Sequence, residues 1–351
     1  MTRRPRSAAL VPATIALTAG LLAAPAPAIA APAAAARTAG AATTAGGATG
    51  VTTAGEVTGA TEVTAAGGRH GRLPETIALP TGSLPEGIAR GCGTTFYAGS
   101  RADGSIVVGD LRTGSTRQLV AGVSGRVAVG MVYEARADRL WVAGGATGAI
   151  TAYDAGTGQE LGRWVVPGSG FLNDVEVTRE GVYVTDSAVQ RLVVIPLGRR
   201  GALPATDGAR TLEITGDLVY GPGFNANGIR AYRGALIVTQ SSTGDLFRVD
   251  PRTGASERIQ VSGRDLTAGD GLVLRGRTLY VVFGFSTDSA AVVRLSRDGR
   301  SGEVVGEVGD PDLDRPTTGV LAAGALWLVN GRFEVADPRS ADYQVVRVDL
   351  R

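Results

Sequence analysis

The sequence predicts an all-β fold, a six-bladed β-propeller that follows an N-terminal signal peptide and a disordered spacer. From Leu73 onward the chain consists of short β-branched and aromatic runs, such as "TTFYAGS", "LWVAGG" and "VYVTDS", separated by turns rich in Gly, Asp and Thr. No convincing amphipathic helix interrupts these runs. The pattern recurs six times at similar spacing, which is typical of a repeat architecture.

Each repeat opens with a short segment of alternating apolar residues. The segments are "EGIAR", "VGMVY", "NDVEV", "NGIRA", "DGLVL" and "TGVLA", and they begin at Glu86, Val129, Asn173, Asn227, Asp270 and Thr318. The intervals are 43, 44, 54, 43 and 48 residues, close to the length of a four-stranded propeller blade. The long third interval contains "GRRGALPATDGAR", which we expect to be a surface loop beside the pocket that acts as a lid.

The propeller domain is predicted to span residues 73–351, and its two ends to meet in one blade. The last repeat ends at "YQVVRVDLR", which is its third strand, so a fourth strand is missing there. The segment 73–80 contains "ETIALP", which has strand character. We expect it to complete the last blade and hide two exposed strand edges. The three tryptophans, Trp141, Trp164 and Trp327, are expected to pack between blades.

The N-terminal residues are predicted to be targeting and spacer segments. Residues 1–30 combine three early arginines, an apolar run and a small-residue end at "AIA", as in a cleaved signal peptide. Prolines interrupt the run, which argues against a membrane anchor, and no other stretch is long enough to span a membrane. Residues 31–72 are mostly Ala, Gly, Thr and Val and predict a flexible spacer. We therefore expect a secreted monomer whose spacer lies against the cell wall.

The charge composition excludes several classes of function. The net charge is +2, and without the three leader arginines 32 basic residues face 33 acidic ones, about −1. Nucleic-acid-binding proteins carry a basic field that is missing here, so we expect no nucleic-acid partner. All 35 basic residues are arginines, which excludes a Schiff-base lysine and a phosphate-loop lysine.

The single cysteine and the single histidine narrow the chemistry further. Cys92 has no second cysteine to pair with, and we expect it to be a buried small residue rather than a nucleophile. His70 lies in or beside the spacer. The propeller therefore lacks a histidine base, a histidine metal ligand and a Ser-His-Asp triad.

Polar side chains occupy one phase of the repeat. The innermost strands of a propeller converge at one end of a central channel, and four of the six repeats begin there with a carboxylate or an amide side chain: Glu86, Asn173, Asn227 and Asp270. Converging hard oxygen donors with two negative charges predict a site for Ca²⁺ or a similar divalent ion, and the lack of His and Cys argues against structural zinc. The alternative is that Asn and Asp before Gly are ordinary turn residues.

These motifs resemble those of the regucalcin/gluconolactonase family of six-bladed propellers, over roughly residues 73–351. "EGIA", "ND", "NGI" and "DGL" occur in the order of that family. The resemblance implies that Glu86, Asn227 and Asp270 bind one divalent cation and that Asn173 lies in the substrate pocket. In the hydrolytic members the aspartate corresponding to Asp270 is also the favoured general base.

Two departures from the family bear on the substrate. The first motif reads "EGIAR" where family enzymes usually read "EGPxW", and Phe171 stands where an arginine commonly helps to bind polar sugar lactones. The metal-binding set is intact while the sugar-binding set is not. We therefore expect an apolar lactone or an ester, with Phe171 forming a wall of the pocket.

The sequence leaves two classes of function open. The first is metal-dependent hydrolysis of a lactone or ester, with Asp270 as the base, Asn173 orienting the substrate and Ca²⁺ favoured over Mn²⁺, Mg²⁺ or Zn²⁺. The second is a non-catalytic secreted propeller that binds a ligand or protein around a structural cation, since propellers host many functions. A deep pocket with an open metal position favours the enzyme, and a closed mouth favours the binding protein.

Overall fold

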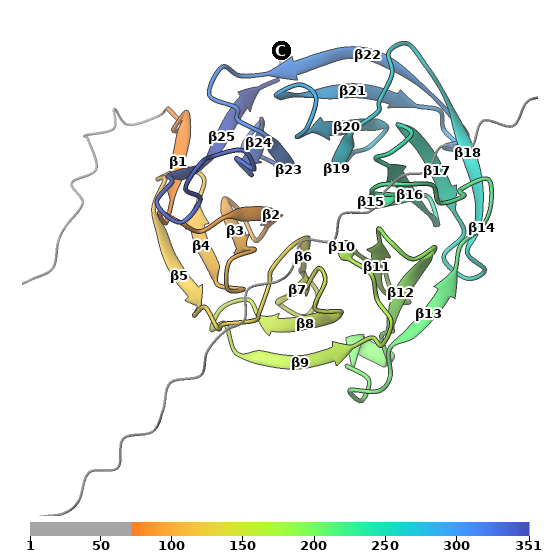
Figure 1. Cartoon of the computed structure of the whole chain (residues 1–351), viewed down its shortest axis with the longest axis horizontal. Helices are drawn as coiled ribbons and strands as arrows, with labels where there is room; N and C mark the ends of the chain where they lie inside the picture. The colour runs from red at the N-terminus through yellow and green to blue at the C-terminus, as the bar shows by residue number, and fades with distance from the viewer. Residues whose placement is uncertain (1–71, 351) are drawn as a thin grey trace, which may run out of the picture. The chain divides into compact units, whose positions relative to one another are not determined.

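The computed structural model describes residues 72–350, which form a β-propeller of antiparallel sheets around a central axis (Figure 1). The predicted signal peptide, His70 and the predicted spacer up to residue 71 lie outside the described residues. Within residues 72–350 the one helix is the short 3₁₀-helix η1 (Arg199–Gly201). None of the described helices is long and apolar enough to cross a membrane.

The strands form four layers from the central axis outward. The innermost strands are β2 (Pro85–Arg90), β6 (Met131–Glu134), β10 (Leu172–Val177), β15 (Ala226–Tyr232), β19 (Gly269–Arg275) and β23 (Pro316–Ala322). The second strands are β3 (Thr95–Ser100), β7 (Arg139–Ala143), β11 (Gly181–Asp186), β16 (Ala235–Gln240), β20 (Thr278–Phe283) and β24 (Ala325–Asn330). The third strands are β4 (Ile106–Asp110), β8 (Ala149–Asp154), β12 (Arg191–Pro196), β17 (Asp245–Val249), β21 (Ser289–Leu295) and β25 (Tyr343–Asp349). The outer strands are β5 (Thr116–Val120), β9 (Glu160–Val165), β13 (Arg210–Glu213), β18 (Ala255–Ser262), β22 (Ser301–Gly309) and β1 (Thr76–Leu79).

Hydrogen bonding divides these strands into four four-stranded sheets and one nine-stranded sheet. In the nine-stranded sheet, β15 to β18 and β19 to β22 are each consecutive antiparallel strands. Their outer strands, β18 and β22, join through a parallel pairing of three residues, and the two-residue strand β14 (Thr215–Gly216) also pairs with β18. The innermost strands of neighbouring sheets lie against one another around the axis.

The predicted closure of the ring is confirmed. Strand β1 pairs antiparallel with β25, so the sheet order is β1-β25-β24-β23. Ile77 and Leu79 point into the core, while Ala78 between them is exposed. The first strand of the domain thereby covers the edge that the last strand would otherwise expose.

Apolar side chains fill the space between adjacent sheets. Trp141 and Trp164 are buried in one cluster with their rings 5.4 Å apart, and Trp327 is buried in another. The predicted packing of all three tryptophans between blades is confirmed. The prediction for Cys92 is wrong: it is exposed in the turn between β2 and β3, where its Sγ lies 3.2 Å from the hydroxyl of Tyr133. Turn residues stay at the surface even beside a buried strand.

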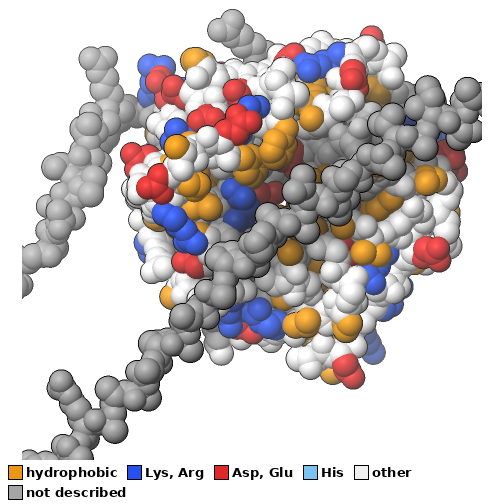
Figure 2. Space-filling view, in the orientation of Figure 1, with side chains coloured by type: hydrophobic (Ala, Val, Ile, Leu, Met, Phe, Trp, Pro, Cys, Tyr) orange, Lys and Arg blue, Asp and Glu red, His pale blue; other side chains and the backbone are white. Residues whose placement is uncertain are grey.

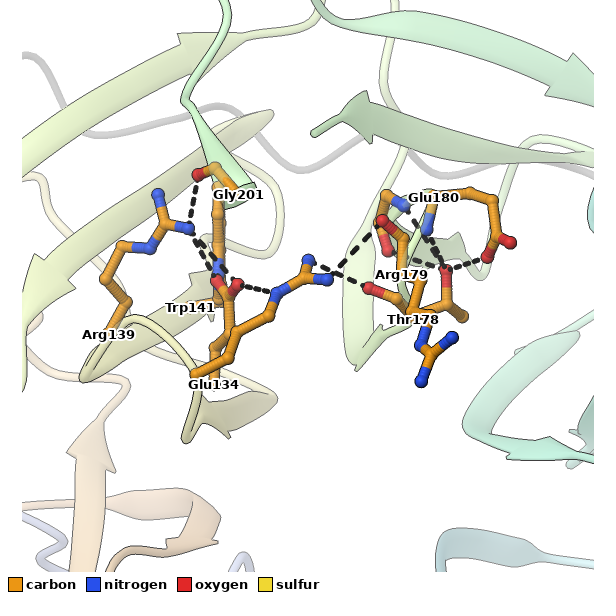
Figure 3. Close-up of polar contacts among 9 residues, drawn as sticks. Glu134, Arg139, Trp141, Thr178, Arg179, Glu180 and Gly201 are labelled. Carbon is orange, nitrogen blue, oxygen red and sulfur yellow. Dashed lines mark hydrogen bonds and ion pairs between the residues drawn. The ribbon is translucent and has the colours of Figure 1, made fainter. Parts of the chain in front are cut away.

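A buried carboxylate organises the end of β6 (Figure 3). Glu134 accepts hydrogen bonds from the indole of Trp141 (2.8 Å) and from the guanidinium groups of Arg136 and Arg139. Arg139 and Glu134 are both nearly inaccessible to solvent. The pair therefore depends on complete hydrogen bonding, because a buried charge without a partner is strongly destabilising.

The same arginines tie β6 and β7 to the neighbouring sheet. Arg136 donates to the backbone oxygen of Thr178, and Arg139 donates to that of Gly201 (Figure 3). Gly201 belongs to "GRRGALPATDGAR", for which we predicted a lid beside the pocket. That prediction is wrong, because the segment connects β12 to β13 and its carbonyl groups at Gly201 and Ala205 bind Arg139 and Trp164 instead.

Truncating the closing strand should destabilise the domain. Ile77→Ala removes a fully buried side chain, and we expect it to lower the free energy of unfolding by about 2–4 kcal/mol. Ala78→Ser, on the exposed face of the same strand, should change it by less than about 0.5 kcal/mol. Urea unfolding followed by tryptophan fluorescence measures both. Equal effects of the two substitutions would show that the strand does not close the ring.

Glu134→Gln should destabilise the domain by about 3 kcal/mol, because it leaves the buried Arg139 without a counter-charge. The matched substitution Glu180→Gln, at an exposed carboxylate that bonds only Thr178, should have little effect. Both are measured by urea unfolding. A loss below about 1 kcal/mol for Glu134→Gln would contradict the assigned role of the network.

Candidate functional site

A β-bulge near the start of the innermost strands positions the candidate residues. The strand registers shift between Pro85 and Ile88, and at the matching places in β10, β15, β19 and β23. Two residues therefore face one partner residue at each of these places, and such bulges re-aim side chains. The first residue inside each of these bulges is, in order, Glu86, Asn173, Asn227, Asp270 and Thr317.

The register corrects one predicted position. Thr317, and not Thr318, stands at the phase of Glu86, because it directly follows the paired residue Pro316. Its hydroxyl donates to the backbone oxygen of Glu86, so it joins two neighbouring sheets. Val129 lines the cavity as the corresponding apolar residue of its repeat.

The glycines of these motifs permit close approach between innermost strands. A Cβ at Gly87 would lie 2.0 Å from the backbone oxygen of Val129, and one at Gly228 would lie 2.6 Å from that of Asp270. Gly228 and Gly271, which follow Asn227 and Asp270, lie inside strands, so the alternative interpretation of these two pairs as turns is wrong. In β10 an aspartate replaces the glycine: Asp174 accepts hydrogen bonds from the backbone of Ile229 (3.1 Å) and from Arg230 (2.8 Å).

Two serines fix the orientation of the two asparagine amides. Ser187 donates its hydroxyl proton to the backbone oxygen of Ala226 (2.7 Å), so it accepts the hydrogen bond from Asn173 Nδ2 (2.9 Å). Ser241 likewise donates to the backbone oxygen of Gly269 (2.6 Å) and accepts from Asn227 Nδ2 (3.0 Å). Each amide nitrogen thereby donates one hydrogen bond to a serine, which turns the amide so that its carbonyl oxygen has no hydrogen-bond partner among residues 72–350.

The sequence prediction did not include these serines. Each follows the second strand of its sheet, 14 residues after its asparagine, in "VYVTDS" and "LIVTQS". The shared pattern was visible in the sequence. Its meaning depends on knowing that the end of the second strand lies at the same end of the sheet as the start of the first.

Glu86 and Asp270 bring two carboxyl groups to the same buried place. Glu86 is 9% exposed and Asp270 5%, and Glu86 Oε2 has no hydrogen-bond partner among residues 72–350. Burial, with the charges of Asp270 and Asp174 added, raises the pKa of Glu86 well above its usual range. Burial also raises the pKa of Asp270 to about 7, against the opposing effect of the Asn227 amide. Both groups would be stabilised as anions by a nearby cation.

All five predicted site residues line one cavity of about 620 Å³. Glu86, Asn173, Asn227 and Asp270 are buried, whereas Phe224 and Phe285, which also line it, are 52% and 58% exposed. Phe171 forms an edge-to-face pair with Phe224, with ring centroids 5.4 Å apart. Figure 2 shows hydrophobic side chains around the central hollow, with basic and acidic side chains beside them. The structure thus brings the predicted residues together, and their roles in binding stay predictions.

The donor set fits a hard divalent cation. Residues 72–350 contain no cluster of three or more His, Cys, Asp and Glu side chains. Two carboxylates and two amide carbonyls are the oxygen donors that Ca²⁺ accepts. The partnerless Glu86 Oε2 is a buried acceptor that such an ion would satisfy.

Comparison with protein families and curated proteins gives limited information. No family model matches the chain, so the resemblance to the regucalcin/gluconolactonase family stays a prediction. Two curated relatives are similar, both named uncharacterized protein YncE, from Salmonella typhi and from Salmonella typhimurium strain LT2. Each is 25% identical over 189 residues, which cover 52% of this chain and 51% of the relative. The chain thus spans about half the length of the curated relatives it matches.

Solved structures support the propeller fold. The major Malassezia sympodialis allergen Mala s 1 is similar with a TM-score of 0.59 and 15% identity, over 79% of this chain and 97% of the allergen. A Bacteroides thetaiotaomicron protein of unknown function gives 0.53 and 15%, over 76% and 69%. A streptogramin B lyase gives 0.52 and 11%, over 78% and 96%. At these identities the likeness shows the fold alone: the chain is a β-propeller protein.

Proposed function

We propose that this protein is a divalent-cation-dependent hydrolase that cleaves a lactone or ester with an apolar substituent. One observation carries the proposal. Two buried carboxylates and two amides held by serines meet in an open cavity of about 620 Å³, and one carboxylate oxygen there has no partner among the described residues. An open cavity of this size has room for a small substrate.

The proposal includes the number of blades and the location of the protein. We count six blades by treating β15–β18 and β19–β22 as separate blades, since only a three-residue parallel pairing joins their outer strands. Residues 1–30 have the pattern of a signal peptide, which supports secretion.

Glu86, Asn227 and Asp270 would hold the cation, as the sequence resemblance implies. Their all-oxygen donor set favours Ca²⁺ over softer ions, with Mn²⁺, Mg²⁺ and Zn²⁺ as alternatives. When bound, the cation polarises a substrate carbonyl group and lowers the pKa of water. Ser241 contributes by keeping the carbonyl oxygen of Asn227 free for this role.

The remaining chemistry belongs to side chains in the cavity. Asp270 accepts the proton of the attacking water, as its place among the buried polar groups suggests. Asn173, held by Ser187, orients the substrate through its free carbonyl oxygen. Phe171 and Phe224 exclude water from the apolar part of the substrate.

The exposed phenylalanines at the cavity also suit a second candidate, a non-catalytic propeller that binds a ligand around a structural cation. Phe224 and Phe285 form an apolar surface that faces solvent, as at many binding sites. Turnover separates the two candidates, because a binding protein would hold the cation and the ligand without hydrolysis.

Calorimetric titration of the purified, metal-stripped chain with Ca²⁺, Mn²⁺ and Zn²⁺ tests the cation site. We expect saturable binding of one ion, lost in Asp270→Ala because a buried ligand is removed. Asp154→Ala, at a turn carboxylate that bonds Thr157, should bind as the wild type does. The ion that binds is then supplied in assays with aryl esters and apolar lactones. Absence of binding by the wild type, or equal binding by Asp270→Ala, would contradict the proposal.

Asp270→Asn should stabilise the metal-free protein at pH 8, by on the order of 1–3 kcal/mol. The folded pKa of Asp270, about 7, lies above the ordinary value of 3.8. The native state therefore loses stability as pH rises from about 4 to 7, and the neutral amide removes this loss. Saturating cation should reverse the order, since only the wild type gains binding free energy.

Urea unfolding at pH 5 and pH 8, with chelator or with cation, measures these differences. Asp154→Asn is the control, and it should lower the free energy of unfolding at pH 8, because hydrogen bonds from Thr157 lower the pKa of Asp154. A destabilised Asp270→Asn variant at pH 8 in chelator would show that the carboxylate contributes to the fold rather than to cation binding.

A further inference from the structure

Arg101 lines the cavity as a cation with no ion-pair partner among residues 72–350. It follows β3 directly, and its backbone N–H donates to the carbonyl oxygen of Leu84 (3.0 Å), which fixes the turn. Within residues 72–350 its guanidinium forms no ion pair, and its Nε is buried without a hydrogen-bond partner. Burial lowers the pKa of Arg101, although the charge of Glu86 opposes this effect. A half-buried cation with free donors is an expected binding site for an anion.

The repeat shows that the fold does not require an arginine here. The residues at the same place, directly after the second strand, are small in the other sheets with the same bulge: Ser187, Ser241, Gly284 and Gly331. In the sheets that contain β10 and β15, the serine at this place accepts a hydrogen bond from the asparagine of the bulge. Arg101 is the one charged member of this set, and it lines the same cavity as Glu86 without forming an ion pair with it.

Aromatic stacking holds the guanidinium of Arg101 at the cavity wall. Its Cζ lies 4.4 Å from the ring centroid of Phe333, a cation–π contact. Phe333 in turn stacks on Phe285 with centroids 4.8 Å apart and planes 11° apart. Stacking of this kind leaves the N–H groups of an arginine available for a planar anion.

The cavity is also the main aromatic surface of the protein. Four of the seven phenylalanines of the chain line it: Phe171, Phe224, Phe285 and Phe333. They form two pairs, one from the segments that precede β10 and β15 and one from the segments that follow β20 and β24. An apolar group placed between such pairs gains contact with several ring faces.

The balance of charges in the cavity indicates the charge of the ligand. Glu86 and Asp270 carry two negative charges when ionised, and a divalent cation would neutralise both. Arg101 would then be the uncompensated charge of the cavity. A cation-loaded site should therefore prefer an anionic ligand over a neutral or cationic one.

We propose that the cavity binds small carboxylates that carry an aromatic ring, with the carboxylate on Arg101 and the ring between the two phenylalanine pairs. This inference rests on the proposed function and names its substrate class: an aromatic ester or lactone that bears a separate carboxylate group. Arg101 selects the substrate, and the hydrolysed bond lies at Glu86 and Asp270.

Calorimetric titration of the cation-loaded full chain with 4-phenylbutyrate, 4-phenylbutanol, 4-phenylbutylamine and butyrate tests the inference. We expect 4-phenylbutyrate to bind at least about tenfold more tightly than the other three, because only it has both the ring and the negative charge. Arg101→Met should remove about tenfold of this affinity while leaving 4-phenylbutanol unchanged, and Arg101→Lys should retain part of it. Phe333→Leu should weaken the binding of 4-phenylbutyrate and of 4-phenylbutanol, because both place the ring against the phenylalanine pairs. Arg112→Met, at an exposed turn, is the matched control.

Equal affinity for 4-phenylbutyrate and 4-phenylbutanol, or unchanged affinity in a folded Arg101→Met or Arg101→Lys variant, would overturn the inference. Different outcomes overturn the inference and the proposed function. Hydrolysis of neutral esters with no preference for those bearing a carboxylate would overturn the inference alone. Selective binding of 4-phenylbutyrate to a protein that hydrolyses no ester would support the aromatic-carboxylate site and overturn the proposed hydrolase function.

Discussion

The close approach of neighbouring innermost strands is the constraint on which the rest of the structure depends. Gly87 and Gly228 let the next strand pass where a Cβ would meet its backbone oxygen, and Asp174 achieves the same junction through hydrogen bonds to β15. Because the strands converge this tightly, the bulge residues just before these junctions are brought to one place around the axis. The same packing that closes the channel therefore creates the site.

The groups that form the site lower the stability of the fold. Glu86 and Asp270 are buried with few partners, and burial raises the pKa of both. A protein tolerates such a site when the surrounding structure is rigid. Here that rigidity comes from contacts in every layer of the fold: strand β1 closes the ring, tryptophans pack between sheets, and Glu134 links two sheets through Arg136 and Arg139.

The fold, the closing strand and the convergence of the site residues were predictable, because the repeats of a propeller are visible as a regular spacing in the sequence. The spacing of the opening segments predicted the fold, "ETIALP" predicted the closing strand, and one repeat phase predicted that Glu86, Asn173, Asn227 and Asp270 would meet. The details that failed depend on geometry that single strands do not show. The bulge places Thr317, and not Thr318, at the position equivalent to Glu86. The segment predicted as a lid lies between β12 and β13, away from the cavity. Arg101 and the serines that hold the asparagines were missed because they reach the site from the ends of second strands.

The differences between repeats carry the specificity of the site. Every repeat needs its strand pairing and its close junction, so those positions resemble one another around the ring. The positions beside them are free to vary: two repeats supply a serine and a phenylalanine, one supplies Arg101, and two more supply a phenylalanine. A residue that departs from its equivalents without a structural reason therefore points to a ligand. Arg101, charged where its equivalents are serine or glycine and stacked on Phe333 without an ion pair among residues 72–350, meets that criterion most clearly.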